Sequence, residues 1–312
     1  MHRLSANVRG ILAVLALCTP PLTAQPAEPL AFPKVHRVDG GAGEMFANAY
    51  IIEGRSGVVL MDSLLSRTAS NALRERALGL NKPVLAVVVT HGHPDHYGGI
   101  AQVVNGSSTI PVLATAGVDA IIRRDDAMKG ARLAVAGFDW AKVRTFPNVL
   151  VSDGVEITLG DITLTPVDVG AAESHHDSLW VLHGPRGKQV FVGDLIMEGV
   201  HAYTADAHTG HWLAALGRYA ALLRAATTIY PGHGEPGHAA EMLERQARYL
   251  EKFRAEVLDL ARGRASLSPE QAKELERRMV RFAGHDRVSR WVIEGGSPVA
   301  RELTVDSGGA TR

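Results

Sequence analysis

Four side chains of the kinds that bind metal ions lie within six residues of this 312-residue sequence. They are His91, His93, Asp95 and His96, and they directly follow the apolar run Val84–Thr90. Two histidines at positions i and i+2 of an extended turn can point at one cation, and the next bend lets Asp95 and His96 face a second position nearby. Clustering such groups is unfavourable unless a cation offsets their crowding. The segment therefore predicts a metal site, and imidazole with carboxylate suits Zn²⁺ best, with Fe or Mn as alternatives.

The segments around this cluster alternate between strand-like and helix-like patterns. Residues 84–90 are apolar throughout, which is typical of a strand buried on both faces. Further strand patterns lie at 35–38, 47–53, 57–61, 109–114, 155–159, 162–169, 178–182, 189–192 and 227–230. Helical spacing marks 66–78, 211–224 and 239–262, and Ser268-Pro269-Glu270-Gln271 has the residues of a capping box that begins another helix. The interleaving predicts an α/β fold in which helices cover the sheet.

Three further motifs extend the pattern along the chain. Asp62 ends a strand before the cluster, Asp194 follows a strand in the sequence FVGD, and His233 lies in YPGHG. With the HxHxDH box, these motifs resemble the metallo-β-lactamase superfamily over roughly residues 35–240. The resemblance implies that family's α/β fold, a four-layer αββα sandwich, here with extra C-terminal helices.

The resemblance also implies a role for each motif. Six residues match the family's metal ligands: His91, His93, Asp95, His96, Asp194 and His233. Asp194 would bridge two ions, and Asp62 would support a ligating histidine from behind. Asp95 would also be catalytic, because it can orient the attacking water or pass its proton to the leaving group. We therefore expect two zinc ions per chain.

One element departs from the family pattern. The family usually supplies a third histidine between the box and the Gly-Asp element, and the corresponding stretch here is residues 170–178, with Glu173, His175 and His176. Read without gaps, the stretch places Glu173 at the ligand position. His175 or His176 would be the more usual zinc ligand but needs a shift of two or three residues. Both alternatives stand, and a glutamate would lower the net charge of the first metal site and alter its metal preference.

The resemblance implies hydrolysis by metal-activated water of a small-molecule ester, thioester, lactone or amide (including lactam) bond. One alternative is a mononuclear iron oxygenase of the persulfide dioxygenase type, which needs two histidines and one aspartate; the presence of Asp95, His96, Asp194 and His233 favours two ions instead. Another is a β-lactamase of the subclass B3 type, which the altered third motif and the long C-terminal helices fit poorly.

Composition narrows the class of partner. The chain has 33 Lys+Arg against 33 Asp+Glu and is 46% hydrophobic, which excludes wholesale disorder. A balanced charge also argues against a nucleic-acid partner, which usually requires a basic face. We expect a small-molecule substrate, no nucleic acid and no stable membrane insertion, with a homo-oligomer left open.

The first 24 residues have the features of a cleaved signal peptide for export to the periplasm. Arg3 and Arg9 precede the apolar run Ile11–Leu17, and Ala24 suits the cleavage position. Lipid attachment at Cys18 is the weaker interpretation. Because Cys18 is the only cysteine, the mature chain would have only histidine and carboxylate for a metal. The expected organisation is a signal peptide at 1–24, a metallo-β-lactamase-like domain at 25–240 and a helical extension at 241–312 packed on that domain.

Overall fold

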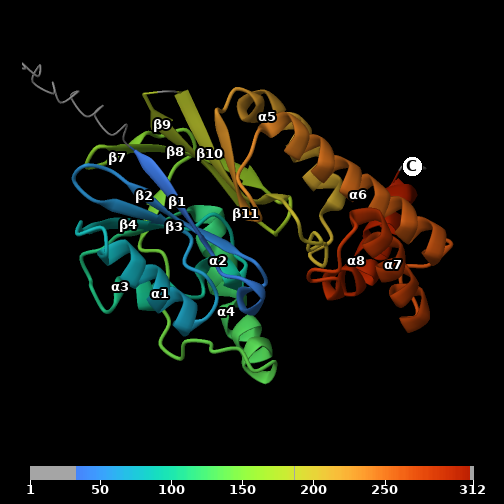
Figure 1. The fold of residues 1–312 in the computed structure, drawn as a ribbon. Helices are drawn as coiled ribbons and strands as arrows, with labels where there is room; N and C mark the ends of the chain where they lie inside the picture. Colours follow the sequence, from blue (N-terminus) through green and yellow to red (C-terminus); the bar gives the residue numbers. More distant parts are fainter. Residues whose placement is uncertain (1–32, 186, 310–312) are drawn as a thin grey trace, which may run out of the picture. The chain divides into compact units, whose positions relative to one another are not determined.

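The N-terminal half of the chain forms the first of two sheets (Figure 1). The computed structural model describes residues 33–185 and 187–309, so the predicted signal peptide at 1–24 lies outside the described residues. The first sheet has the order β1-β2-β3-β4-β5-β6, with β1 (Lys34–Asp39), β2 (Asn48–Glu53), β3 (Val58–Met61), β4 (Val84–Val88), β5 (Val112–Thr115) and β6 (Val149–Val151). The pairs from β1 to β3 are antiparallel and those from β3 to β6 are parallel. The apolar run that precedes the histidine cluster is thus an inner strand, β4.

The second sheet contributes the other ligand-bearing strands. Its order is β11-β10-β9-β8-β7, with β7 (Ile157–Leu159), β8 (Ile162–Gly170), β9 (Asp177–Gly184), β10 (Gly187–Met197) and β11 (Thr228–His233). Only the β10–β11 pair is parallel. Parallel strands end at the same edge of a sheet, so the segment that bears Asp194 and the one that bears His233 are brought to one place.

The two sheets pack face to face because their strands alternate in the side chains they bury. In β2, Tyr50 and Ile52 join a core between the sheets, together with Trp180 and Phe191 of the second sheet. Ile51 points to the opposite face of the first sheet and packs in a separate core. The helices of the N-terminal half are α1 (Arg67–Leu78), α2 (Pro94–Tyr97), α3 (Ile100–Val104) and α4 (Ala116–Val135), with a short 3₁₀ turn, η1 (Ala42–Glu44).

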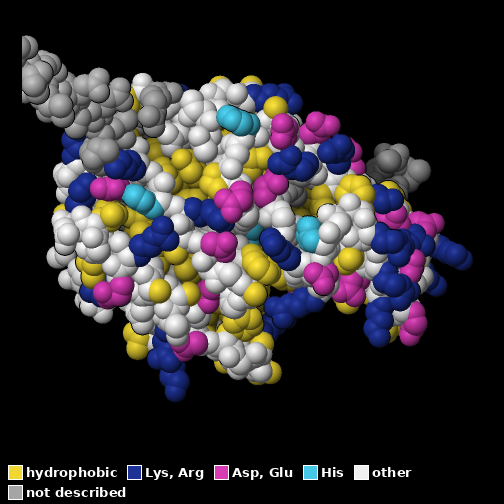
Figure 2. Space-filling view, viewed as in Figure 1, with side chains coloured by type: hydrophobic (Ala, Val, Ile, Leu, Met, Phe, Trp, Pro, Cys, Tyr) yellow, Lys and Arg dark blue, Asp and Glu magenta, His cyan; other side chains and the backbone are white. Residues whose placement is uncertain are grey.

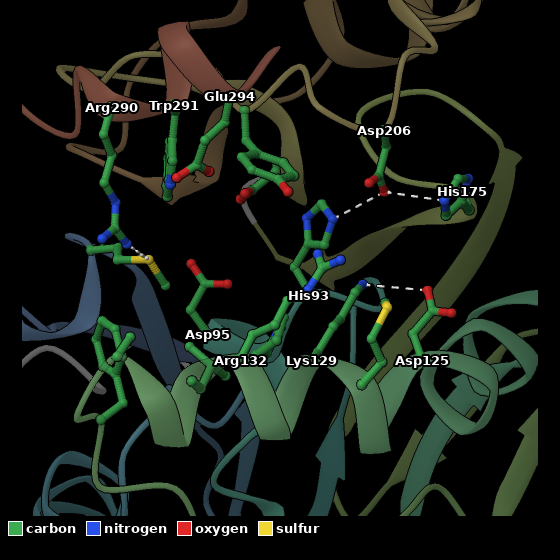
Figure 3. Close-up of a pocket in the computed structure, with 18 of the residues that line it drawn as sticks. His93, Asp95, Asp125, Lys129, Arg132, His175, Asp206, Arg290, Trp291 and Glu294 are labelled. Atoms are coloured by element: carbon green, nitrogen blue, oxygen red, sulfur yellow. Dashed lines mark hydrogen bonds and ion pairs between the residues drawn. The ribbon is translucent and has the colours of Figure 1, made fainter. Parts of the chain in front are cut away.

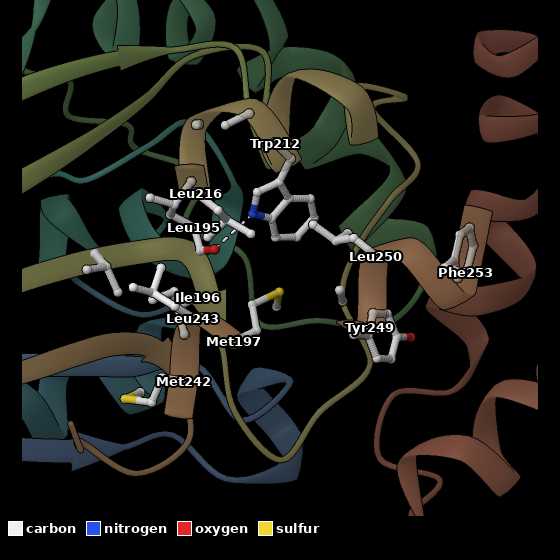
Figure 4. Close-up of a cluster of buried hydrophobic side chains, with 14 of the residues drawn as sticks. Leu195, Ile196, Met197, Trp212, Leu216, Met242, Leu243, Tyr249, Leu250 and Phe253 are labelled. Carbon is white, nitrogen blue, oxygen red and sulfur yellow. Dashed lines mark hydrogen bonds between the residues drawn. The ribbon is translucent and has the colours of Figure 1, made fainter. Parts of the chain in front are cut away.

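The outer face of the second sheet is covered by the C-terminal helices. They are α5 (Thr209–Arg224) and α6 (Ala239–Ala261), which contact the sheet, and α7 (Pro269–Ala283) and α8 (Arg290–Gly309), which pack on α6. Their largest contact is a hydrophobic core in which the Trp212 indole N–H donates to the Leu195 carbonyl at 2.8 Å (Figure 4). The layers are therefore helix, sheet, sheet, helix, and the αββα prediction with extra C-terminal helices is confirmed. Because Leu195 follows Asp194, this core also fixes the strand that carries a predicted ligand.

Two helices differ from the sequence-based expectation. The 20-residue helix α4 was not predicted, because its apolar residues do not form one stripe and it buries Asp119, Asp125 and Asp126. No helix pattern was identified in the sequence for α8, which continues to Gly309. Gly295 lets α8 pack closely against Thr204, since a side chain at this position would overlap the Thr204 hydroxyl. The predicted capping box of Ser268 and Gln271 is confirmed at the start of α7.

The surface of the C-terminal helices carries charges of both signs. Figure 2 shows Lys and Arg interleaved with Asp and Glu over this part of the chain. Arg278 of α7, for example, pairs with Glu256 and Asp259 of α6 at 2.6 and 2.7 Å. Within residues 33–185 and 187–309, no helix combines the length and apolar character needed to cross a bilayer.

Candidate metal centre

The predicted ligands meet at one end of the two sheets. The histidine box follows β4, Asp194 lies in an irregular part of β10, and His233 ends β11. His91 forms a bridge with Asp177 at the start of β9, which joins the two sheets at this point. The loops that follow these strands therefore bring distant parts of the sequence together.

The first group of potential ligands consists of His91, His93, Glu173 and Asp194, each offering one atom within 4.8 Å of the others. His91 Nε2 lies 3.7 Å from Glu173 Oε2 and 3.7 Å from Asp194 Oδ2. His93 Nδ1 lies 3.0 Å from Glu173 Oε2. The four donor atoms therefore surround one position.

The second group consists of Asp95, His96 and His233. Asp95 Oδ2 lies 3.7 Å from His96 Nε2 and 3.5 Å from His233 Nε2. Asp194 also faces this group, with Oδ1 3.4 Å from His96 Nε2 and Oδ2 3.2 Å from His233 Nε2. Asp194 is thus the one carboxylate that contacts both groups among the described residues.

The spacing and the burial of these atoms fit divalent metal ions. Ligand atoms of a tetrahedral zinc ion, with bonds of about 2.0–2.2 Å, lie about 3.3–3.6 Å apart, and the donor–donor distances here are 3.0–3.7 Å. No residue of the two groups is more than 6% exposed. Six of their atoms are buried without a hydrogen-bond partner: His91 Nε2, His96 Nε2, His233 Nε2, Glu173 Oε1, Glu173 Oε2 and Asp194 Oδ1. Buried polar atoms are normally paired, so this convergence indicates a site able to bind metal.

The second ring nitrogen of each histidine is held by a neighbour. His96 Nδ1 lies 2.9 Å from Asp62 Oδ2, where the sequence predicted a supporting carboxylate. Asp62 also accepts from the backbone N–H and the hydroxyl of Thr90. His233 Nδ1 donates to the Met45 carbonyl at 3.1 Å, and His91 Nδ1 lies 3.0 Å from Thr90 Oγ1. These contacts leave the Nε2 atoms of the three rings free to face a metal.

Glu173, and not His176, joins the first group. Asp177 braces the turn that carries Glu173, since its Oδ2 accepts from the backbone N–H of Ala172 and Ser174 at 3.2 and 2.9 Å. His176 points away and bonds to Asp168 Oδ1 at 2.5 Å, so its prediction as a ligand is corrected. His175 bonds to His208 at 2.7 Å instead. The ungapped interpretation of this stretch is the one that the structure follows.

Gly232 of the YPGHG motif permits the close approach of Asp194. A Cβ at this position would overlap Asp194 Oδ1 and contact the backbone of Gly193. We expect Gly232→Ala to displace the Asp194 carboxylate and to lower metal affinity at least about tenfold, as disturbed ligand geometry usually does. Metal content after dialysis against a chelator of known affinity measures the change. Gly43→Ala is the matched control, because a Cβ there meets nothing within 4 Å; equal metal retention by both variants would contradict the argument.

Asp206 was not singled out in the sequence. It lies in the loop between β10 and α5, and its Oδ2 lies 3.2 Å from His93 Nε2, the nitrogen that faces away from Glu173. A carboxylate in this place fixes the orientation of the His93 ring. It also makes the other ring nitrogen, Nδ1, a more basic ligand for a metal ion. No periodicity or motif surrounds Asp206, so only the folded chain reveals its contact.

We expect Asp206→Ala to weaken metal binding by roughly ten- to a hundredfold, the range found when a carboxylate behind a ligating histidine is removed. Competition with a chromophoric chelator measures the affinity. Asp259→Ala, at an exposed ion pair of α6, is the control and should bind metal as the parent chain does. An Asp206→Ala chain of unchanged affinity would show that His93 needs no such support.

The histidines of the site form ion pairs with its carboxylates. Burial disfavours the protonated form of His93, but the Glu173 and Asp206 carboxylates together outweigh it and raise the pKa of His93 to about 10. In the same way, the Asp194 and Asp95 carboxylates together outweigh burial and raise the pKa of His233 to about 9. Metal binding must therefore displace protons from these histidines.

A cavity of about 430 Å³ opens beside the two groups (Figure 3). It reaches His93, Asp95 and Asp194, so a small molecule in it would touch both candidate metal positions. Its other walls come from α4 and from the beginning of α8. Tyr203 stands beside His93, with ring centroids 5.1 Å apart. The site is thus accessible to a substrate of modest size.

Comparison with protein families gives a match over most of the described chain. The family profile described as "Metallo-beta-lactamase superfamily" matches residues 42–233. This range includes Asp62, Glu173 and every predicted ligand.

Individual proteins similar to this chain are more distant or match only in part. A linear primary-alkylsulfatase from Pseudomonas sp. is 42% identical over 65 residues, which are 19% of this chain and 9% of that protein. An (R)-specific secondary-alkylsulfatase from Pseudomonas sp. is 39% identical over 79 residues, 23% of this chain and 11% of that protein. A β-lactamase domain protein from Burkholderia ambifaria has a similar structure, with a TM-score of 0.60, 20% identity and coverage of 84% of this chain and 82% of its own. This last likeness shows the fold alone.

Proposed function

This chain belongs to the metallo-beta-lactamase superfamily, and we propose that it is a zinc-dependent hydrolase with two metal ions per chain. The proposed substrate is a small molecule with an ester, thioester, lactone or lactam bond. One observation carries the proposal: Asp194 lies between two groups of buried donor atoms, six of which have no hydrogen-bond partner.

Two sets of side chains would each bind one metal ion. His91, His93 and Glu173 would hold one ion, and Asp95, His96 and His233 would hold the other, with Asp194 shared. A bound divalent metal supplies a Lewis acid and lowers the pKa of water to about 7. Asp95 also lines the cavity, where its carboxylate can accept a proton and hold it for a leaving group.

Tyr203 adds a hydrogen-bond donor to the cavity. Burial raises the pKa of its hydroxyl far above neutral, so the O–H stays protonated and can donate to a substrate oxygen. The buried indole of Trp291 packs against both Tyr203 and His233, with ring centroids 5.6 Å apart in each pair, and helps to exclude water from this wall.

A sulfuric ester is the second candidate substrate. The two alkylsulfatases named above support it, since both share a segment about 40% identical to this chain. This chain spans only about a tenth of their length, so their activity is carried over here as a proposal alone.

Metal analysis and a substrate panel test the proposal together. The purified chain should contain about two zinc ions and should cleave at least one member of a panel made of nitrocefin, a γ-lactone, an acyl thioester, 4-nitrophenyl acetate and 4-nitrophenyl sulfate. Chelation should abolish that activity and added Zn²⁺ should restore it. One iron per chain with oxygen consumption on a persulfide would replace this function with the oxygenase, and full activity after chelation would refute a metal mechanism.

We also propose export to the periplasm, on the pattern of residues 1–24. Fractionation of cells that express the full chain should find a shortened protein in the periplasmic fraction. A full-length protein in the cytoplasm would refute export.

A further inference from the structure

The cavity beside the metal groups contains more cations than carboxylates outside those groups. Four cationic side chains line it, Arg124, Lys129, Arg132 and Arg290, against three further carboxylates, Asp125, Asp206 and Glu294. The walls come from α4 and the beginning of α8, which lie on opposite sides of the opening in Figure 3. Neither helix segment belongs to the motifs that predicted the metal centre.

Two of these cations already have partners. Arg124 makes a two-pronged contact with Asp125, at 2.6 and 2.8 Å. Lys129 donates to the Gly92 carbonyl at 2.9 Å and lies 3.6 Å from Asp125. The hydrogen bond from Lys129 to Gly92 holds α4 against the loop that carries His91 and His93.

Arg132 and Arg290 are different. Within the part of the chain that the structure describes, the Arg132 side chain has no hydrogen bond or ion pair, and the Arg290 guanidinium contacts only Met45 Sδ, at 3.6 Å. Burial raises the pKa of Glu294, while the positive charges of Arg290 and Arg132 act to lower it. Glu294 nevertheless forms no close ion pair with either guanidinium group. Two guanidinium groups without a close anionic partner therefore face one cavity, and the guanidinium fork matches a planar oxyanion.

The same cavity is also lined by apolar side chains. Trp291 is buried beside Tyr203 and His233, and Met128, at 47% exposure, and Phe138 line the side formed by α4. A substrate held by the arginines would therefore place its hydrocarbon part against these side chains.

We propose that Arg132 on one side of the cavity and Arg290 on the other are binding positions for an oxyanion group of the substrate, so that the enzyme selects organic acids or their amphipathic esters over neutral compounds. The proposal rests on the proposed function for the position of the cleaved bond. In this proposal, two helices outside the metal-binding motifs, α4 and α8, determine which class of substrate binds. Carboxylate, sulfate and phosphate share the geometry that a guanidinium recognises.

Binding of chain-matched acids tests the proposal without any turnover. Dissociation constants of the purified full-length chain are measured by calorimetry for mono- and dicarboxylates of equal length, from butyrate and succinate to octanoate and suberate. One carboxylate of either compound can face the metal groups, whereas only the second carboxylate of the diacid can reach the arginines. At one length or more the diacid should bind at least about tenfold more tightly, the effect of one charge-assisted hydrogen bond.

In the double variant Arg132→Met/Arg290→Met, the preference for the diacid should fall to within about twofold. Both arginines are exposed in the parent chain, and circular dichroism can check that the variant folds. Arg76→Met, at an exposed arginine of α1 with no ion pair among the described residues, is the matched control and should keep the preference. Equal or undetectable binding of diacid and monoacid at every length, or a preference that survives in the double variant, would overturn the proposal. Loss of hydrolysis across the substrate panel, with the preference intact, would refute the proposed function alone.

Discussion

Replacing Asp194 with alanine should lower kcat/KM on the cleaved substrate by at least about a thousandfold and should release metal from the chain. Asp194 is the one described side chain within 4 Å of His91, His96 and His233, so its loss weakens both ligand groups at once. It also leaves buried imidazoles facing one another without the carboxylate between them, which disfavours charge there. Elemental analysis of the purified variant and initial rates on the active panel member measure the two effects.

Asp39→Ala is a suitable control for that experiment. Asp39 is an exposed carboxylate at the end of β1, 48% accessible at its side chain, and it pairs only with nearby polar groups. This variant should keep its metal and its rate. An Asp194→Ala chain that retained two ions and a rate within tenfold of the parent would show that Asp194 does not connect the groups.

Much of the framework was predictable from local patterns. Val84–Val88 is apolar at every position, and the alternation in Asn48–Glu53 matches a strand with one core on each face. The histidine box is a short segment whose spacing by itself indicates a metal site, whereas the role of Asp62 was predicted from the resemblance to a family.

The unpredicted parts depend on contacts between distant segments. Glu173 could not be separated from His176 in the sequence, because the decision rests on how Asp177 folds the preceding turn. Asp206 carries no local signal, and its contact with His93 spans 113 residues. Helix α4 was not predicted because some of its carboxylates are buried in ion pairs with arginines, for example Asp126 with Arg144. The polar residues of α4 therefore lie on its buried side as well as on its exposed side, and no amphipathic pattern appears in the sequence.

Removing the metal should lower the melting temperature by about 10 °C or more. A ligand at a thousandfold excess over its Kd stabilises the folded chain by about 4 kcal/mol, and one kcal/mol shifts the melting temperature of a chain of roughly this size by about 2–4 °C. Seven buried side chains with potential ligand atoms converge here. After removal of the cation, six of their atoms would be buried without a hydrogen-bond partner. Calorimetry of the loaded and the chelated chain measures the difference.

The size of that difference should depend on pH in a definite direction. In the metal-free chain the pKa of His93 is raised to about 10 and that of His233 to about 9, so their ion pairs stabilise it fully below about pH 6.5, the unfolded value. This contribution is lost as the pH rises toward 9–10, whereas metal binding strengthens because fewer protons must be displaced. The gap in melting temperature should therefore widen from about pH 6.5 to about pH 9. In Asp194→Ala chelation should hardly shift the melting temperature, and a parent gap that narrowed with rising pH would mean that these histidines do not bind the ion as neutral ligands.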